Sequence, residues 1–232
     1  MCGRFSSTSQ LQFLLEQFRA EPLGVEGHQP SWNVAPASDI LVVTASPDGA
    51  RQLRALRWGL VPRWAKDPSG ANKMINLRAE TVREKKGWRS TLARKRCIIP
   101  IDGFYEWQDQ GKGQRKQPFY ITSRDFTPLA LAGLWATWRD PDSGEELFTC
   151  TILTTSANDL MEPVHHRMPV ILAPDAEAMW LDPEITDPGM LLSLLVPYPA
   201  EVMEAFPVGQ GVNAVANDSP QLVLPLDLPR PD

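Results

Sequence analysis

The sequence has few residues that could bind a metal ion or form disulfides. Its 232 residues include six candidate zinc ligands of the sulfur or imidazole type: Cys2, Cys97, Cys150, His28, His165 and His166. Three widely spaced cysteines form neither a disulfide framework nor a paired-cysteine zinc site. We therefore expect no bound metal, and no motif in the sequence indicates an organic cofactor.

Long apolar runs and the common enzyme motifs are also missing. No segment approaches the roughly 18 apolar residues of a membrane span, and the first residues lack the charged-then-apolar layout of a signal peptide. There is no glycine-rich phosphate loop and no Gly-x-Ser-x-Gly nucleophile elbow. These absences exclude most familiar enzyme classes and a membrane partner, and they favour a cytoplasmic protein.

Positive charge is scarce overall but concentrated in one stretch. The net charge is −5, yet residues 51–96 hold 14 Lys or Arg against three acidic residues, which makes this stretch about +11 and the remainder about −16. Such asymmetry is typical of a basic surface on an acidic body, where a polyanion would dock. A solvated face with no partner is the alternative.

Strand patterns outnumber helix patterns and do not alternate with them. Apolar or alternating runs bounded by turn residues predict strands at 40–44, 51–59, 117–123, 129–138, 147–155 and 166–172. Helices are predicted at 11–18, 76–87, 175–181 and 189–195. The fold class is therefore α+β, with a mostly antiparallel, barrel-like core and flanking helices. The length favours one domain over 1–232, ending in a proline-rich strap at 221–232.

The first helix is predicted close behind the N-terminus. Leu11, Leu14, Leu15 and Phe18 follow the i, i+3, i+4, i+7 spacing of one helix face. Ser7 and Gln10 have the spacing of a capping box. A helix here would hold the start of the chain near the body of the domain.

Cys2 directly follows Met1 and would become the N-terminal residue if Met1 were removed. An α-amine has a pKa near 7.7–8.0 against about 10.4 for lysine, so at neutral pH it is unprotonated on the order of a few hundred times more often. It can form a Schiff base with an aldehyde, and the thiol can then close a thiazolidine ring. An incidental cysteine at position 2 is the alternative.

Glu106 and the histidine pair could move protons. Glu106 lies between aromatic residues in PIDGFYEW, and desolvation by such neighbours brings a carboxyl pKa closer to neutrality, which suits a general acid or base. His165 and His166 lie in a loop framed by Pro163 and Pro169. Histidine is the usual proton shuttle at neutral pH. A strand-edge glutamate and two idle loop histidines are the alternatives.

Two further groups suit contact with a nucleic acid. Asn76 and Arg78 are two residues apart and would share a face of an extended segment, where an amide could hold an oxygen and a guanidinium could bind a phosphate. Trp58 and Trp64 lie among basic residues in WGLVPRWAKD, a mixture expected of a platform for single-stranded bases. Capping by Asn76 and tryptophans buried in the core are the alternatives.

Six blocks in order carry a resemblance to a known family. MCGRF, NVAP, WGLVPRW, NLRAET, CIIPIDGFYEW and HHRMPVIL resemble the signature blocks of the SRAP (SOS response-associated peptidase) family, whose members process abasic sites in DNA. The resemblance implies a monomer that acts in DNA repair without a metal or cofactor. It also implies that Cys2 crosslinks to abasic sites in single-stranded DNA through a thiazolidine, and that the protein is nucleoid-associated when bound to DNA.

The same resemblance assigns roles to individual residues. It implies that Asn76 positions the sugar or the terminal Cys2, that Glu106 is the general acid or base, and that His165 assists proton transfer. His166 occupies a variable position and receives no role. The DNA contacts that it implies, to phosphates or flanking bases, are Arg4, Pro36, Trp64, Arg78 and Trp107.

Three hypotheses remain open from the sequence. The first is the abasic-site crosslinker, with a lyase side activity by β-elimination at the Schiff-base stage. The second is a cysteine-type peptidase, as the family's name suggests, whose activity could be limited to removing Met1. The third is a non-catalytic module that binds single-stranded DNA.

Overall fold

Five strands close into a barrel at the centre of the computed structural model, which describes residues 2–226. In hydrogen-bonding order they are β11 (Glu146–Ser156), β10 (Leu129–Arg139), β7 (Arg96–Ile101), β4 (Asp39–Ala45) and β5 (Arg51–Trp58). Successive pairs are antiparallel. The ring closes where β5 pairs with β11 in parallel, with Trp58 opposite Cys150.

The barrel strand β4 is apolar on both faces, and both of its faces are buried. In β4, Ile40 and Val42 point into the barrel, where their inner cluster also holds Trp58, while Leu41 and Val43 belong to an outer cluster. This is the alternation expected of a strand, with a hydrophobic layer on each side. Because β4 is buried on both faces, its sequence contains the continuous apolar run ILVV in place of an alternation of apolar and polar residues.

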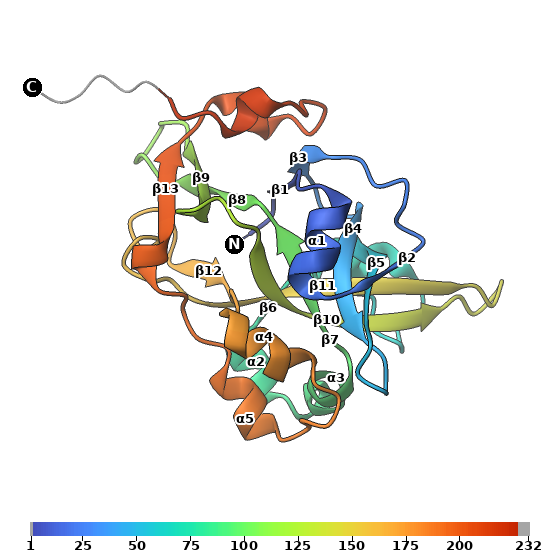
Figure 1. Cartoon of the computed structure of the whole chain (residues 1–232). Helices are drawn as coiled ribbons and strands as arrows, with labels where there is room; N and C mark the ends of the chain where they lie inside the picture. Colours follow the sequence, from blue (N-terminus) through green and yellow to red (C-terminus); the bar gives the residue numbers. More distant parts are fainter. Residues whose placement is uncertain (1, 227–232) are drawn as a thin grey trace, which may run out of the picture.

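Helices cover the outer cluster. They are α1 (Leu11–Phe18), α2 (Ala79–Glu84), α3 (Arg89–Arg94), α4 (Pro174–Leu181) and α5 (Pro188–Ser193). In Figure 1, α2 to α5 gather on one side of the barrel and α1 lies across β4. Short 3-10 turns connect other elements at Pro68–Lys73, Lys86–Trp88, Ala200–Val202, Gln210–Asn213 and Pro220–Val223.

A second, antiparallel sheet brings the N-terminus to the barrel (Figure 1). Its order is β13 (Met203–Pro207), β9 (Gln117–Ser123), β8 (Gly103–Gln108), β1 (Phe5–Ser7) and β3 (Ser31–Val34). Phe5, Phe104 and Ile121 of this sheet join the inner cluster of the barrel. Short strands complete the barrel sheet: β2 (Glu21–Leu23) beside β5, and β6 (Asn76–Arg78) and β12 (Arg167–Pro169) beside β11.

The predicted fold class, α+β with a mostly antiparallel, barrel-like core and flanking helices, is confirmed. The helices at 11–18, 175–181 and 189–195 and all the predicted strands are present within a few residues. The helix predicted at 76–87 was wrong at both ends, since residues 76–78 form β6 and only Ala79–Glu84 are α-helical. Pairing with β11 supplies backbone hydrogen bonds that outweigh the local helix preference.

The capping box predicted from Ser7 and Gln10 was also wrong. Ser7 belongs to β1 and is buried, and the Gln10 side chain makes no capping hydrogen bond. Instead the Asp102 carboxylate, from the turn between β7 and β8, accepts hydrogen bonds from the backbone and hydroxyl groups of Thr8 and Ser9. A tertiary contact therefore orders the turn between β1 and α1.

The C-terminal segment lies against the second sheet as far as the structure describes it. Leu222 is buried in a small cluster with Tyr105 and Tyr120, and the Leu226 N–H donates to the Pro207 carbonyl. Of the predicted strap at 221–232, Leu222 is buried while Leu224 and Leu226 are exposed, and residues 227–232 lie outside the described residues. Within residues 2–226, no helix is long and apolar enough to cross a membrane.

The interior of the barrel has no room for a side chain at Gly133. A Cβ atom there would lie 2.3 Å from Cδ1 of Ile99 and 2.9 Å from the carbonyl oxygen of Thr151. We expect Gly133→Ala to lower the free energy of unfolding by about 1–3 kcal/mol, the usual cost of overpacking. Urea unfolding measures this. The control Gly209→Ala, where a Cβ meets no atom within 4 Å, should be near neutral.

Candidate functional site

Cys2 lies beside Glu106 because β1 and β8 are antiparallel. Phe5 pairs with Phe104, and the Tyr105 N–H donates to the Arg4 carbonyl at 2.9 Å, so Cys2 and Gly3 run alongside Glu106. The Cys2 side chain is fully buried in the inner cluster of the barrel. Burial raises the pKa of the Cys2 thiol, and the charge of Glu106 raises it further. At neutral pH this thiol therefore stays protonated and needs a base to become a nucleophile.

Asn76 contacts Cys2 directly. Its side-chain Nδ2 donates a hydrogen bond of 2.7 Å to the Cys2 carbonyl oxygen. The strand β6 puts Leu77 into the outer cluster, while Asn76 and Arg78 project from the other side. The expectation that Asn76 and Arg78 share a face is confirmed, and Arg78 is exposed.

Glu106 is a buried carboxylate at the centre of the group. It lies on β8 and is only 3% exposed, next to the fully buried Tyr105. Its charge acts on two neighbours, since it raises the pKa of the Cys2 thiol and opposes the fall in the pKa of His165. Glu106 therefore lies close enough to both groups for its charge to act on them.

His165 is held in one orientation by the backbone. Its Nδ1 accepts the backbone N–H of Arg167 at 2.9 Å, so in the neutral ring the proton is on Nε2. Burial lowers the pKa of His165, and the charge of Glu106 partly offsets this. The imidazole of the exposed His166 stacks on His165 with ring centroids 4.4 Å apart.

The loop that carries His165 is anchored on both sides. The His165 N–H donates to the Met161 carbonyl at 2.8 Å, and Met161 in turn donates to the Asn158 side chain. Gln108, at the end of the strand that carries Glu106, donates from Nε2 to the Pro163 carbonyl at 2.9 Å. These contacts fix the histidine loop relative to β8.

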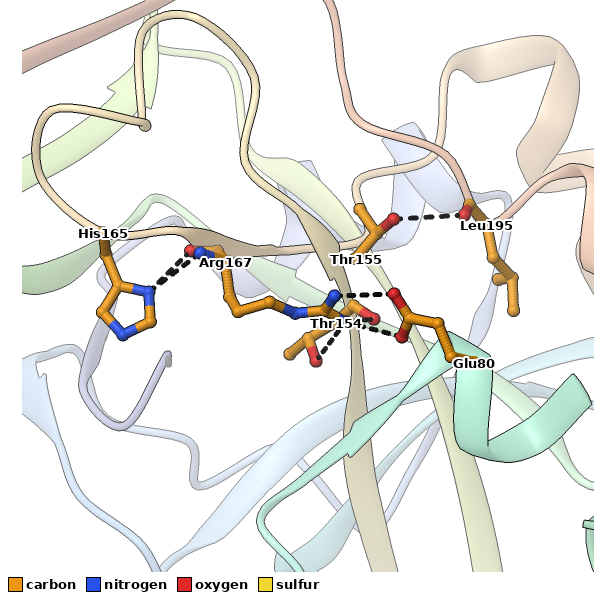
Figure 2. A network of polar contacts seen from close by, with 6 residues as sticks. All are labelled: Glu80, Thr154, Thr155, His165, Arg167 and Leu195. Atoms are coloured by element: carbon orange, nitrogen blue, oxygen red, sulfur yellow. Dashed lines mark hydrogen bonds and ion pairs between the residues drawn. The ribbon is translucent and has the colours of Figure 1, made fainter. Parts of the chain in front are cut away.

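Arg167, the residue after the two histidines, forms an ion pair with Glu80 (Figure 2). The Arg167 guanidinium donates to both carboxylate oxygens of Glu80, at 2.7 and 2.9 Å, and to the Thr154 carbonyl at 2.7 Å. The Arg167 side chain is 10% exposed and that of Glu80 is 52% exposed. The pair joins β12 to α2, directly behind the backbone N–H that orients His165.

The sequence did not single out Glu80 or Arg167 for a role. Glu80 is in the block NLRAET and Arg167 is in HHRMPVIL, each within four residues of a candidate site residue. An acid and an arginine in two such blocks could have suggested a pair. Only the pairing of β11 with β6 in parallel along one edge, and with β12 antiparallel along the other, brings them together.

The residues predicted to contact DNA have different surroundings. Trp64 is 85% exposed in the loop after β5, while Trp107 is half-buried and its Nε1 donates to Asn213. Arg4 is partly buried, and one of its nitrogens, Nη1, donates to Asn33 and to the Val212 carbonyl. The structure keeps Pro36 half-buried in the turn between β3 and β4.

Trp64 borders a largely apolar cavity of about 700 Å³, whose wall also includes Met74, Lys85 and Trp88. Met74 is two residues before Asn76, so the cavity adjoins β6, the strand from which Asn76 contacts Cys2.

Trp58 was also proposed as part of a stacking platform, and this was wrong. It is fully buried, and its Nε1 donates to the Ile75 carbonyl.

The basic stretch at 51–96 does not form one surface. Arg96 is buried and donates to the backbone carbonyls of Leu92, Ala93, Trp180 and Asp182, so it has a structural role. Arg78 and Lys85 are exposed on the side of β6 and α2, while Arg54 and Lys95 line a separate cavity. Among residues 2–226 there is no cluster of three or more His, Cys, Asp or Glu that could hold a metal ion.

Comparison with known proteins identifies the family. The family described as "SOS response associated peptidase (SRAP)" matches residues 1–215. The chain belongs to the SRAP family. It is 47% identical over 224 residues to the abasic site processing protein YoqW of Bacillus subtilis (strain 168), with 96% of this chain and 99% of that protein covered.

A more distant relative and a solved structure are also similar to this chain. The chain is 35% identical over 231 residues to the abasic site processing protein HMCES of Gallus gallus, with 87% of this chain and 68% of that protein covered. A crystal structure of a protein from Bacteroides thetaiotaomicron superposes with a TM-score of 0.86 at 28% identity, covering 97% of this chain and all of that one. The barrel and its second sheet are therefore a fold that is already known in a crystal structure.

Replacing Glu80 should destabilise the protein in a pH-dependent way. Glu80→Gln leaves the buried Arg167 without its carboxylate, so we expect a loss of about 1 kcal/mol at neutral pH, kept small because Glu80 is half-exposed. Arg167 lowers the pKa of Glu80 below its ordinary value of 4.5. The stabilisation is therefore complete above that value and is lost as the pH falls through the lowered folded-state pKa.

Urea unfolding of the wild type and Glu80→Gln across this pH range measures the effect. The matched control is Glu84→Gln, at the exposed end of the same helix, which should stay close to the wild type. A Glu80→Gln loss that persisted after the carboxyl had been protonated would contradict the ion-pair explanation.

Proposed function

We propose that this protein processes abasic sites in single-stranded DNA by covalent capture through Cys2. The observation that carries the proposal is the hydrogen bond from Asn76 to the Cys2 carbonyl, with the buried Glu106 beside the thiol. A cysteine held by its backbone at a carboxylate is suited to act as an N-terminal aminothiol. The names of the SRAP relatives, abasic site processing proteins, support the same substrate.

The proposed reaction consumes an aldehyde and releases one water. Removal of Met1 exposes the α-amine of Cys2, which attacks C1′ of the ring-opened deoxyribose to form a carbinolamine. Loss of water gives the Schiff base. The Cys2 sulfur then adds to the same carbon while the thiol proton moves to the nitrogen, and the five-membered thiazolidine closes. Without the sulfur addition, the Schiff base would permit β-elimination, the expected lyase side reaction.

Each neighbour of Cys2 has a role in this proposal. Glu106 removes the thiol proton, which the raised pKa of Cys2 would otherwise retain, and returns it to the nitrogen. Asn76 keeps the Cys2 backbone in place during both steps. As the sugar ring opens, Glu106 takes the proton of the C1′ hydroxyl and returns it to the ring oxygen. The neutral His165 assists by donating a hydrogen bond from Nε2 to the sugar.

The DNA path follows the exposed groups near Asn76. Arg78 extends from the same face of β6 and would bind a phosphate next to the abasic sugar. Trp64 offers an exposed ring for one flanking base. Trp107, on β8 next to Glu106, would contact another. Arg4 and Pro36 would contact the DNA from the side of the protein formed by β1 and β3.

The first test is a crosslinking assay with protein confirmed by intact mass to begin at Cys2. A single-stranded oligonucleotide with one abasic site should give a heat-stable band on a denaturing gel, with the mass of protein plus DNA minus one water. An unmodified oligonucleotide should give none. Cys2→Ala should abolish the band, because no sulfur remains to close the ring.

Cys2→Ser is the matched control, since it keeps a small N-terminal residue and an α-amine. It should give a product only when borohydride traps the Schiff base. No band from the correctly processed wild type would contradict the proposal, and hydrolysis of peptides in the absence of DNA would favour a peptidase. DNA binding with full function in Cys2→Ala would favour a non-catalytic binding module.

A second test concerns the DNA surface. Trp64→Ala should weaken binding of single-stranded DNA by about 1–3 kcal/mol, the usual value of one base stacked on an aromatic ring. Arg78→Ala should reduce the salt dependence of binding by about one phosphate contact. Fluorescence anisotropy at several salt concentrations measures both. The control is Arg139→Ala, at the exposed last residue of β10, which should bind like the wild type. Equal losses of binding in all three variants would contradict the assignment.

A further inference from the structure

The barrel has a second open end, and positively charged side chains line it. A cavity of about 560 Å³ lies between the end of β4, the start of β5, the middle of β10, the end of α3 and the residues that follow α4. Its charged and polar lining includes Thr44, Gln52, Arg54, Arg94, Lys95 and Glu184. We call this the distal cavity, and it shares no lining residue with the group around Cys2.

The register of β5 separates the distal cavity from the Cys2 site. Arg54, Leu56 and Trp58 alternate onto the same face of the strand, and Leu56 and Trp58 belong to the inner cluster with Cys2. The Trp58 ring lies 5.0 Å from the ring of Phe5, at the end of the barrel where Cys2 enters. At ~3.3 Å per residue, Arg54 lies about 13 Å from Trp58 along the strand, with packed core between them.

Arg54 and Lys95 are fixed on aromatic rings. The Arg54 guanidinium lies 4.4 Å from the centroid of Phe148, and Lys95 Nζ lies 3.7 Å from the centroid of Trp135. Both side chains are half-buried. Cation–π stacking of this kind holds a charge in place without neutralising it.

Neither charge is neutralised by a carboxylate. No described acidic side chain forms an ion pair with Arg54 or Lys95, since the ion pair found among residues 2–226 joins Arg167 to Glu80. Burial lowers the pKa of both cations, and the charge of Arg54 lowers that of Lys95 further. Of the other charged groups on the lining, Arg96 is bound to backbone carbonyls, while Arg94 and Glu184 are exposed at the rim.

Two preoriented, uncompensated cations in one cavity favour an anion. We propose that the distal cavity is an anion site in which Arg54 and Lys95 together bind a phosphate group. A guanidinium donates two parallel hydrogen bonds to phosphate oxygens, and an ammonium adds a point charge from a second direction. The Thr44 hydroxyl and the Gln52 amide supply further donors on the wall. The phosphate could belong to a small compound or to a DNA strand, and the site does not depend on the function proposed for Cys2.

The test is calorimetric titration at low ionic strength with inorganic phosphate, pyrophosphate and an unmodified single-stranded oligonucleotide. Wild type should bind pyrophosphate, and Arg54→Gln and Lys95→Met should each weaken binding by about tenfold, the value of one charge-assisted hydrogen bond. Arg139→Gln loses the same charge away from the cavity and should bind like the wild type. Cys2→Ala should also bind like the wild type, which separates this site from the Cys2 chemistry.

Each outcome decides the proposal. Weaker binding of phosphate or pyrophosphate in the two cavity variants supports a site for small phosphate compounds, and weaker binding of the oligonucleotide alone supports a site for a DNA phosphate. Equal binding in wild type and cavity variants, or none in any arm, overturns it. If a variant fails to fold, acylation of wild-type lysines followed by mass mapping replaces it. Pyrophosphate should then protect Lys95 but not the exposed Lys112, and unchanged labelling of Lys95 overturns the proposal.

Discussion

The backbone pairing of β11 holds both the barrel and the candidate site together. Along one edge it pairs with β10 and then β12, and along the other with β5 and then β6. The β5 pairing closes the barrel. The β6 and β12 pairings place Asn76 and the backbone that orients His165 on either side of one strand. The geometry around Cys2 therefore depends on a strand that contributes no candidate catalytic side chain itself.

Burial gives the residues of the Cys2 site their chemical character. Removal from water raises the pKa of the Cys2 thiol and lowers that of His165, so both groups are held in their neutral forms near neutral pH. Glu106 is the carboxylate whose charge reaches both of them. In the packed site the charge of Glu106 therefore affects the protonation of both the thiol and the imidazole.

The two ends of the barrel carry different chemical groups. The Cys2 end combines a thiol, a carboxylate and an imidazole with an exposed arginine on β6, the groups on which the proposed capture of an abasic site depends. The distal end combines Arg54 and Lys95 on aromatic rings without a carboxylate partner, which is suited to reversible anion binding. The interior core lies between them, so the charges of the basic stretch at 51–96 are divided between two places.

The sequence by itself determined the fold class, the long strands and the motif blocks that mark the family, because local hydrophobic pattern and order of motifs are written along the chain. The tertiary structure decided the rest. Residues 76–78 became a strand because β11 offered hydrogen bonds, Trp58 became core because the barrel closed around it, and Asp102 ordered the turn at Thr8. The Glu80–Arg167 pair and the distal cavity join residues far apart in sequence, and no local pattern records such distances.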